Sequence, residues 1–157
     1  MKILVLAIGK TDEQWVHEAL FKYSKRLQHY LSFEFEVIQD LKNTKNLSEA
    51  QQKEKEGALI LKMLKPTDIV FLLDEKGKEY RSVEFAKYLQ HQMNSSVKRL
   101  VFIIGGPYGF TPELYAKAQG KLALSKMTFS HQMIRLFFLE QLYRSFSIIK
   151  KEKYHNT

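Results

Sequence analysis

Residues 98–109 are KRLVFIIGGPYG, and this stretch decides the fold class. Residues 98–105, apolar from Leu100 onward, have the length of a strand buried on both faces and run into a glycine-rich turn. Residues 68–74, DIVFLLD, form a second run of this kind, and helical spacing near residues 83–93 separates the two. Buried strands joined through a helix are expected to lie parallel. The sequence therefore predicts an α/β fold with a mostly parallel sheet flanked by helices.

The start of the chain repeats this strand-then-helix order. Residues 2–8 form an aliphatic run that ends at Gly9, which predicts another strand covered on both faces. Residues 11–14, TDEQ, fit a capping box that would begin a helix. The apolar side chains that follow at helical spacing are Trp15, Ala19, Tyr23, Leu27 and Tyr30.

The segments between these strands have weaker patterns. Apolar and acidic side chains alternate over residues 33–38, which is typical of an edge strand. Ser48 and Gln51 then predict the start of a helix that Pro66 stops, with the charged run 53–56 on its solvated face.

Two further elements are expected after the glycine-rich turn. Thr111 followed by Pro112 predicts a capped short helix that extends to about Gly120, and residues 121–125 form a short last strand.

A long helix over about residues 132–150 is apolar around most of its circumference. Such a helix needs two surfaces to pack against, and we expect one to be the sheet and the other a second subunit.

Composition narrows the class of protein. The chain has 157 residues, a net charge of +8 and no cysteine, and 45% of its residues are hydrophobic. This excludes a disordered chain, disulfide scaffolds and thiolate metal sites. We expect one domain over residues 1–157, in the cytoplasm and without a membrane-spanning segment, since no run reaches 18 apolar residues. The positive charge favours an anionic partner such as RNA.

Several familiar sites are absent from the sequence. The Gly9-Lys10-Thr11 triplet resembles the end of a phosphate loop, but Leu4 stands where that loop needs glycine. The first strand-to-helix turn also lacks the glycines of a dinucleotide site. The five histidines have no metal-ligand spacing, so we predict no metal. Asp74-Glu75, at a strand end, is either a carboxylate site or a solvated turn.

The last third of the chain carries the chemistry. Three glycines within residues 105–109 would let a ligand approach the backbone, and residues 121–157 carry seven Lys or Arg against two Glu. Arg135 and Arg144 interrupt an apolar helix, where a guanidinium group usually has an anionic or carbonyl partner. Glu140, four residues before Arg144, is one candidate for that partner.

Five motifs together resemble one known family. They are KILVLAIGK (2–10), IGGPYG (104–109), LSKMTFSHQMIR (124–135), LEQLYR (139–144) and KYH (153–155). The set resembles the RlmH family of bacterial large-subunit ribosomal RNA pseudouridine methyltransferases, which belongs to the SPOUT superfamily. The resemblance implies a C-terminal trefoil knot and a homodimer that binds S-adenosylmethionine in the knot. The implied reaction is methylation of N3 of a pseudouridine in a stem-loop of 23S ribosomal RNA, within the assembled ribosome.

The resemblance also implies site residues. The cofactor pocket would comprise Leu73, Gly105, Leu124, Ser125, Lys126, Met127, Thr128 and Phe129. The chemistry of the implied reaction suggests further candidates. His131 and His155 are candidate bases for the N3 proton, although His131 could equally be a structural histidine at a helix start. Arg135, Arg144 and Tyr154 are candidate contacts to the reacting anion or to phosphate, and Arg144 and Lys153 are candidate RNA contacts. This chain departs from the family in having Ser130 where many relatives have proline, and Asn156 where many have a basic residue.

Alternative functions remain at this point. A related SPOUT methyltransferase could act on transfer RNA instead, and a non-catalytic ribosome-binding factor could keep the same fold. A small nucleotide-binding regulator is disfavoured, because the phosphate-loop and dinucleotide patterns are incomplete.

Overall fold

Five parallel strands form one sheet in the computed structural model, which describes residues 1–155. The strands are β1 (Lys2–Ile8), β2 (Ser32–Ile38), β3 (Ile69–Glu79), β4 (Arg99–Ile104) and β5 (Gly120–Ala123). Their order across the sheet is β2-β1-β4-β3-β5, so β2 is an edge strand, as its alternating pattern predicts. The parallel α/β architecture is confirmed.

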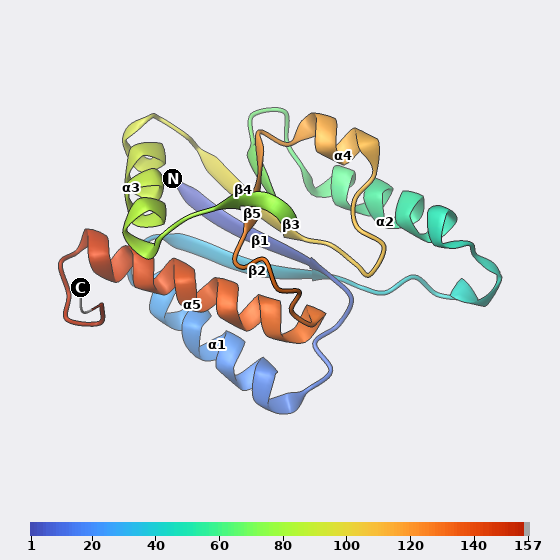
Figure 1. The fold of residues 1–157 in the computed structure, drawn as a ribbon, viewed down its shortest axis with the longest axis horizontal. Helices are drawn as coiled ribbons and strands as arrows, with labels where there is room; N and C mark the ends of the chain where they lie inside the picture. Colours follow the sequence, from blue (N-terminus) through green and yellow to red (C-terminus); the bar gives the residue numbers. More distant parts are fainter. Residues whose placement is uncertain (156–157) are drawn as a thin grey trace.

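Helices cover both faces of this sheet (Figure 1). Helices α1 (Gln14–Gln28), α3 (Ser82–Asn94) and α5 (His131–Ile149) pack on one face. Helices α2 (Glu49–Met63) and α4 (Pro112–Lys117) pack on the other, and a single 3-10 turn, Thr44–Asn46, precedes α2. The trefoil knot depends on how the chain threads through itself, and it stays a prediction.

Burial on both faces explains why residues 3–8 of β1 are all apolar. Ile3, Val5 and Ala7 point into the core beneath α1, α3 and α5, whereas Leu4 and Leu6 point into the core beneath α2 and α4. The first core is rich in aromatic rings, and the centroids of Phe102 and Phe138 lie 4.8 Å apart in an edge-to-face arrangement. Such a contact contributes about 0.5–1.5 kcal/mol beyond the burial of its area.

Helix α5 finds much of its second packing surface within its own chain. It lies against α1 and α3 as well as against the sheet, and Phe138, Leu139, Leu142 and Phe146 are all buried. The apolar surface of α5 that remains for the predicted second subunit is therefore smaller than the sequence suggests. Phe137, 40% exposed, is the large apolar side chain of α5 that stays open to solvent among the described residues.

The start of α1 differs from the prediction. Glu13 is the N-cap and makes no side-chain capping bond. The TDEQ capping box is wrong because α5 holds this segment instead: Arg135 donates to the Thr11 hydroxyl and Gln132 accepts from the backbone N–H of Asp12. The helix then turns Val16, Leu20 and Leu27 into the core and leaves Trp15 52% exposed.

The charged run 53–56 is also not a wholly solvated face. Glu56 is buried, because it stands next to Gly57 on the side of α2 that faces the sheet and the loop after β4. The predicted capping box of Ser48 and Gln51 at the start of this helix is confirmed.

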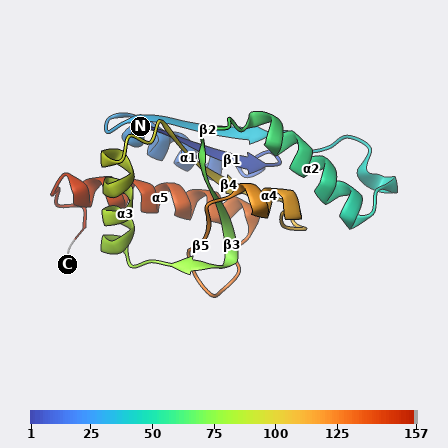
Figure 2. The same cartoon turned by 90° about the horizontal axis from the view of Figure 1, so that it is seen from above.

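Strand β3 extends beyond the predicted residues 68–74. The turn expected after Asp74 is an irregularity inside the strand. The register between β3 and β5 shifts between Leu73 and Lys78, where Asp74 accepts a hydrogen bond from the backbone N–H of Lys76. A side chain at Gly77 would meet the backbone of Leu122 at 2.6 Å, so glycine allows the two strands to approach. Figure 2 shows β3 turning sharply at this point.

The last short elements exist as predicted, but the end of α4 and both ends of the last strand differ: β5 covers Gly120–Ala123, where residues 121–125 were predicted. Thr111 caps α4 and Pro112 is its first residue, as predicted. The helix ends at Lys117, not near Gly120, because Gly120 already pairs with Phe71 as the first residue of β5.

Candidate functional site

A cavity of about 490 Å³ lies at the irregularity of β3 and at the ends of β4 and β5. Ligand sites in open parallel sheets lie at this edge, because the carboxyl ends of the strands and the loops that follow them converge there. The loop after β4, the segment 122–129 and the start of α5 form the walls. The volume falls within the range of about 300–1,000 Å³ that is common for small-molecule sites.

The glycine-rich loop after β4 brings backbone to the cavity surface. A Cβ at Gly105 would lie 2.9 Å from the ring of Phe110, and one at Gly106 would lie 2.5 Å from the Glu56 carboxylate. Gly109 has φ +75°, which side chains rarely adopt. These glycines therefore allow a tight loop whose peptide groups line the cavity.

The segment after β5 forms the opposite wall. Ser125 accepts a hydrogen bond from the backbone N–H of Met127 at 2.9 Å, and the Thr128 hydroxyl donates to Glu75 at 3.0 Å. Met127 is 76% exposed. These two hydrogen bonds join the loop to itself and to β3, so the wall has a defined shape while Met127 remains open to solvent.

Two carboxylates of β3 lie in the same cavity. Asp74 accepts a hydrogen bond from the Tyr115 hydroxyl at 2.6 Å. Burial acts to raise the pKa of Asp74, but the bonds from Tyr115 and from the Lys76 N–H outweigh it and hold that pKa below its ordinary value. Burial, together with Asp74, raises the pKa of Tyr115 to about 12. Of the two alternatives for Asp74-Glu75, their place in the cavity lining favours a carboxylate site over a solvated turn.

The first turn of α5 closes the cavity. Ser130 is the N-cap and accepts from the Met133 N–H, so it provides a side-chain cap that a proline at this position would lack. His131 and Ile134 line the cavity.

Arg135 lies one turn into α5, but it is buried and does not line the cavity. Its guanidinium donates to the Ile8 carbonyl at 2.7 Å and to the Thr11 hydroxyl at 3.1 Å. Its Nε has no partner among the described residues. Burial lowers the pKa of Arg135, and Asp40 and Asp12 partly offset this. In this arrangement Arg135 joins α5 to the β1–α1 loop.

A second cluster of polar side chains forms at the far end of α5. Arg144 pairs with Glu140 at 2.6 Å, which confirms the partner suggested by their spacing. The Tyr154 hydroxyl donates to Glu140 at 3.0 Å, and His155 Nδ1 lies 3.4 Å from Arg144 Nη1. Tyr23 of α1 reaches the same cluster, with its hydroxyl 3.4 Å from that of Tyr154.

The charges in this cluster reinforce one another. The hydrogen bond to Glu140 raises the pKa of Arg144 despite its partial burial. Burial, with the hydrogen bonds to Tyr23 and Glu140, raises the pKa of Tyr154. Arg144 also lies over the Tyr154 ring, 4.9 Å from its centroid. The cluster therefore presents a permanent cation beside a neutral phenol.

The candidate site residues thus separate into two groups. The structure brings seven of the eight predicted cofactor residues to the cavity together with His131; Lys126 is exposed and does not line it. Arg144, Tyr154 and His155 come together at the other end of α5, and Lys153 is exposed beside them. Arg144 lies thirteen positions after His131 on the helix, a rise of about 20 Å. Asn156 lies outside the described residues.

Sequence patterns missed two contributors. Tyr115 reaches Asp74 from α4, and Tyr23 reaches Tyr154 across 131 positions of the chain. Neither contact has a local signal, because each depends on tertiary packing.

Residues 1–155 show neither a metal-binding group nor a membrane-spanning helix. No group of three or more His, Asp or Glu is placed to hold a metal ion. None of the helices is both long and apolar enough to cross a bilayer.

Comparison with known proteins places this geometry in a family. A family model described as "Predicted SPOUT methyltransferase" matches residues 1–155. Proteins named ribosomal RNA large subunit methyltransferase H from Christiangramia forsetii and Parabacteroides distasonis are 60% and 59% identical, over 99% of this chain and 99% of theirs. The relative of the same name from Flavobacterium johnsoniae is 59% identical over the same shares.

The fold also resembles a solved structure. A probable methylase family protein from Haemophilus influenzae gives a TM-score of 0.52 at 12% identity, covering 99% of this chain and 70% of that one. At this identity the likeness concerns the fold alone. The family model and the close relatives together show that the chain belongs to the SPOUT methyltransferase family.

Proposed function

We propose that this protein transfers a methyl group from S-adenosylmethionine to N3 of a pseudouridine in a stem-loop of 23S ribosomal RNA. The observation that carries the proposal is the convergence of seven predicted cofactor residues on one cavity at the carboxyl edge of the sheet. The names of the close relatives support ribosomal RNA of the large subunit as the substrate. The same reasoning favours one methyltransferase domain over residues 1–157, acting in the cytoplasm on the assembled ribosome.

The residues of the cavity fit this donor. Leu73, Leu124 and Phe129 offer apolar surface to an adenine ring, and the peptide groups of Gly105 and Ser125 are near enough to the surface to bind its polar edge. Asp74 and Glu75 place negative charge in the same cavity, which suits a cationic donor with ribose hydroxyls. When bound, the sulfonium supplies an activated methyl group and needs no metal to do so.

The protein must then handle the proton on N3. In a neutral uracil ring this nitrogen carries hydrogen, so a base must accept the proton as the N–C bond forms, or a cation must stabilise the resulting anion. His131, at the cavity, and His155, beside Arg144, are the candidate bases. Arg144 and Tyr154 form a cation and a hydroxyl suited to the developing negative charge on the base.

The separation of the two groups supports a homodimer. A cavity and a tail cluster that lie about 20 Å apart along α5 cannot act on one base within one chain. An apolar hollow adjoins the cavity, and its rings Phe129 and Phe137 lie 4.9 Å apart in contact with solvent. A second copy seated on this surface would bring its Arg144, Tyr154 and His155 to the cavity of the first.

Mixing two inactive variants tests the dimer. Gly105→Val is expected to close the cavity and His155→Ala to disable the tail. If each site combines one cavity with the tail of the other chain, exchange of subunits restores about a quarter of wild-type activity, because a mixed dimer keeps one intact site. If each site were built within a single chain, the mixed dimers would be inactive, because every chain in the mixture carries one of the two substitutions. Circular dichroism and thermal melting of each variant serve as the folding control.

Transfer of radiolabelled methyl groups to ribosomes tests the reaction. We expect one modified nucleotide in 23S ribosomal RNA of ribosomes from a strain that lacks the gene, identified by mass mapping. Label in transfer RNA would instead support the related SPOUT activity. A protein that binds ribosomes but gives no heat of binding with S-adenosylmethionine in calorimetry would be a non-catalytic factor.

A further inference from the structure

A second hollow, of about 370 Å³, lies between the C-terminal ends of α1 and α5. This cleft is at the end of the molecule where the strands begin, away from the donor cavity. Its lining is unusual for a surface hollow, because nearly every side chain is aromatic or basic. The lining residues are Arg26, His29, Tyr30, Tyr143, Lys150 and Glu152.

Aromatic rings hold the arginine of the cleft in place. The Arg26 guanidinium carbon lies 5.6 Å from the centroid of the Tyr23 ring and 5.3 Å from that of Tyr143. Tyr30 stacks on Phe146, with centroids 5.8 Å apart. Side chains packed in this way lose little further freedom when a ligand binds.

The basic groups of the cleft have no carboxylate partner. Throughout residues 1–155, no Asp or Glu oxygen lies within ion-pair distance of Arg26, His29 or Lys150. Arg144, in contrast, forms an ion pair with Glu140 at 2.6 Å. An arginine held by rings and left without an anion is a ready donor for a phosphate oxygen.

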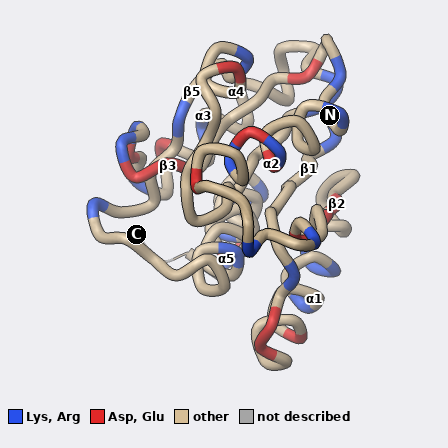
Figure 3. The backbone as a smooth tube through the Cα atoms, turned by 90° about the vertical axis from the view of Figure 1, so that its right-hand side faces the viewer, with Lys and Arg blue, Asp and Glu red and all other residues tan. Residues whose placement is uncertain are grey.

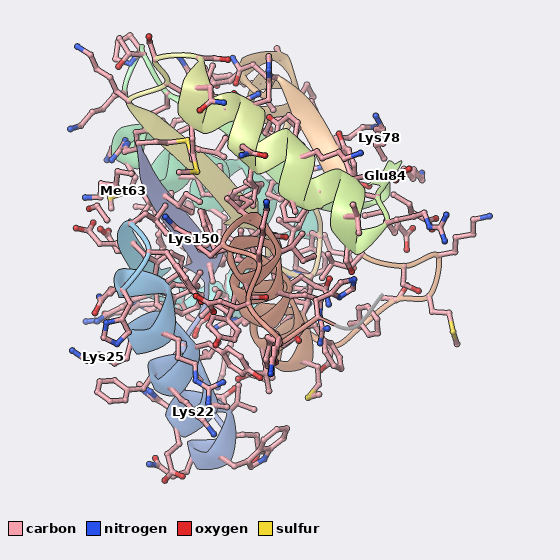
Figure 4. The ribbon with its side chains drawn as sticks, turned by 90° about the vertical axis from the view of Figure 1, so that its left-hand side faces the viewer. Lys22, Lys25, Met63, Lys78, Glu84 and Lys150 are labelled. Carbon is pink, nitrogen blue, oxygen red and sulfur yellow. The ribbon has the colours of Figure 1, made fainter. Side chains whose placement is uncertain are left out.

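Further lysines continue the positive surface. Lys22 and Lys25 are exposed on α1, and Figure 4 shows them on the same side of the molecule as Lys150 at the end of α5. Lys151 and Lys153 follow directly. Helix α1 divides by charge, with acidic residues near its start and basic residues in its second half (Figure 3).

We propose that this cleft binds the ribose-phosphate backbone and one neighbouring base of the RNA beside the methylated nucleotide. The inference rests on the proposed function and names where the substrate would be held. Cations interleaved with aromatic rings match a polymer of phosphates and bases, whereas an acidic peptide would not need the rings.

The position of the cleft fits this role. Tyr143 forms its wall and also contacts Tyr154 of the tail cluster, with ring centroids 4.7 Å apart. The cleft is therefore one aromatic side chain away from the group proposed to meet the target base. RNA that enters the cleft would continue directly to that group.

Substitution of Glu152 tests the cleft through an expected increase in affinity for RNA. Its carboxylate accepts a hydrogen bond from the Tyr30 hydroxyl at 2.5 Å and puts a negative charge into the wall. Glu152→Gln keeps an acceptor for Tyr30 and removes the charge that would repel phosphate. We expect this variant to bind RNA a few-fold more tightly than the wild type, a result that damage to the fold would not produce.

Fluorescence anisotropy with a fluorescein-labelled uridylate dodecamer measures the binding itself. The double variant Arg26→Gln/Lys150→Gln is expected to bind at least about tenfold more weakly, and to lower the slope of log affinity against log salt by about 1.4, the value for two lost single-strand phosphate contacts. The control is Lys55→Gln, which removes one exposed charge from α2 on the other face of the sheet and is expected to bind as the wild type does.

The outcomes separate the cleft from the reaction. In methylation of ribosomes, the double variant should raise KM and leave kcat and the calorimetric affinity for S-adenosylmethionine unchanged. If the double variant binds RNA as Lys55→Gln does, or Glu152→Gln weakens binding, the cleft is not an RNA site, while methylation by the wild type would leave the proposed function standing. If the cleft variants change RNA binding as expected but the wild type methylates no ribosome, the proposed reaction fails and the binding site stands.

Discussion

The two ends of the parallel sheet are built in different ways. At the carboxyl end the strands finish in loops, three glycines bring peptide groups to the surface, and a cavity forms. At the amino end, charged side chains pair with one another: Asp68 with Arg99 beneath the sheet, and Glu140 with Arg144 at the end of α5. The carboxyl end thus leaves backbone available for a small ligand, whereas the amino end offers fixed side chains.

The largest expected effect separates chemistry from donor binding. His155→Ala, at the amino end, should lower the rate of methyl transfer by about 10²–10⁴-fold, the usual contribution of a positioned base, and leave donor affinity within about twofold. Gly105→Val, at the carboxyl end, should abolish donor binding in calorimetry and, with it, methyl transfer. A loss of donor affinity in His155→Ala as large as its loss of rate would show that the two ends do not differ in function.

Asp68 tests whether the amino end also stabilises the fold. Burial raises the pKa of this carboxyl, but the hydrogen bonds from Arg99 and from the Lys65 N–H outweigh it, so its pKa lies below the ordinary value. Asp68→Asn should cost about 2–3 kcal/mol in the free energy of unfolding at pH 7, because a charged, buried hydrogen-bonded pair is broken.

The pH dependence of this variant has a definite sign. Since the folded-state pKa is lower than the unfolded value of about 3.9, the contribution of Asp68 is complete above that pH and disappears as pH falls through the folded-state pKa. Urea unfolding from pH 7 to pH 2.5 should therefore show the wild type and Asp68→Asn converging below about pH 4. A constant difference in stability across this range would contradict the charged pair.

Substitution of Gly106 tests the carboxyl end through the same quantity, the free energy of unfolding. Gly106→Ala would place a methyl group against Glu56 Oε2, and we expect a loss of about 1–3 kcal/mol in urea unfolding, as for other overpacked sites. Adding Glu56→Ala should restore at least half of the loss. Gly57→Ala is the matched control, because its contact is with Thr111 and removal of Glu56 would not relieve it. Additive effects of Gly106→Ala and Glu56→Ala would disprove the contact.

The smallest expected effect concerns the cap of α5. Ser130→Ala should lower the free energy of unfolding by about 1 kcal/mol, since the Met133 N–H loses its acceptor. Ser130→Pro should cost less, because Ser130 already has φ −62°, close to the angle that proline requires. Proline destabilising the protein more than alanine does would mean that a proline at this position needs a different loop.

Local signals explain how far the sequence alone could predict this molecule. The strands β1 and β4, the edge position of β2 and the caps at Ser48 and Thr111 depend on neighbouring residues, and all are confirmed. Seven of the residues predicted to bind the cofactor also lie together at one cavity, because they follow buried strand segments that are local in the sequence; their role stays a prediction. Membership of the family was also predicted, from motifs that cover the chain.

Errors arose where distant segments decide the local structure. Thr11 fits a capping box, but Arg135, 124 residues later, takes its hydroxyl. Glu56 belongs to a charged run, yet the Gly106 loop lies on it and buries it. The two-group division of the site depends on the length and direction of α5, and no motif carries that information.

Because α5 is continuous, its length sets the distance and the relative direction of the two groups of site residues. One uninterrupted helix, without glycine or proline, begins at the cavity and carries Arg144, which pairs with Glu140, near its other end. Inserting a single residue midway would rotate everything beyond it by about 100° and shift it by about 1.5 Å, so the tail would face the wrong way for any neighbouring subunit. Evolution can therefore exchange side chains along this helix far more easily than it can lengthen or shorten it.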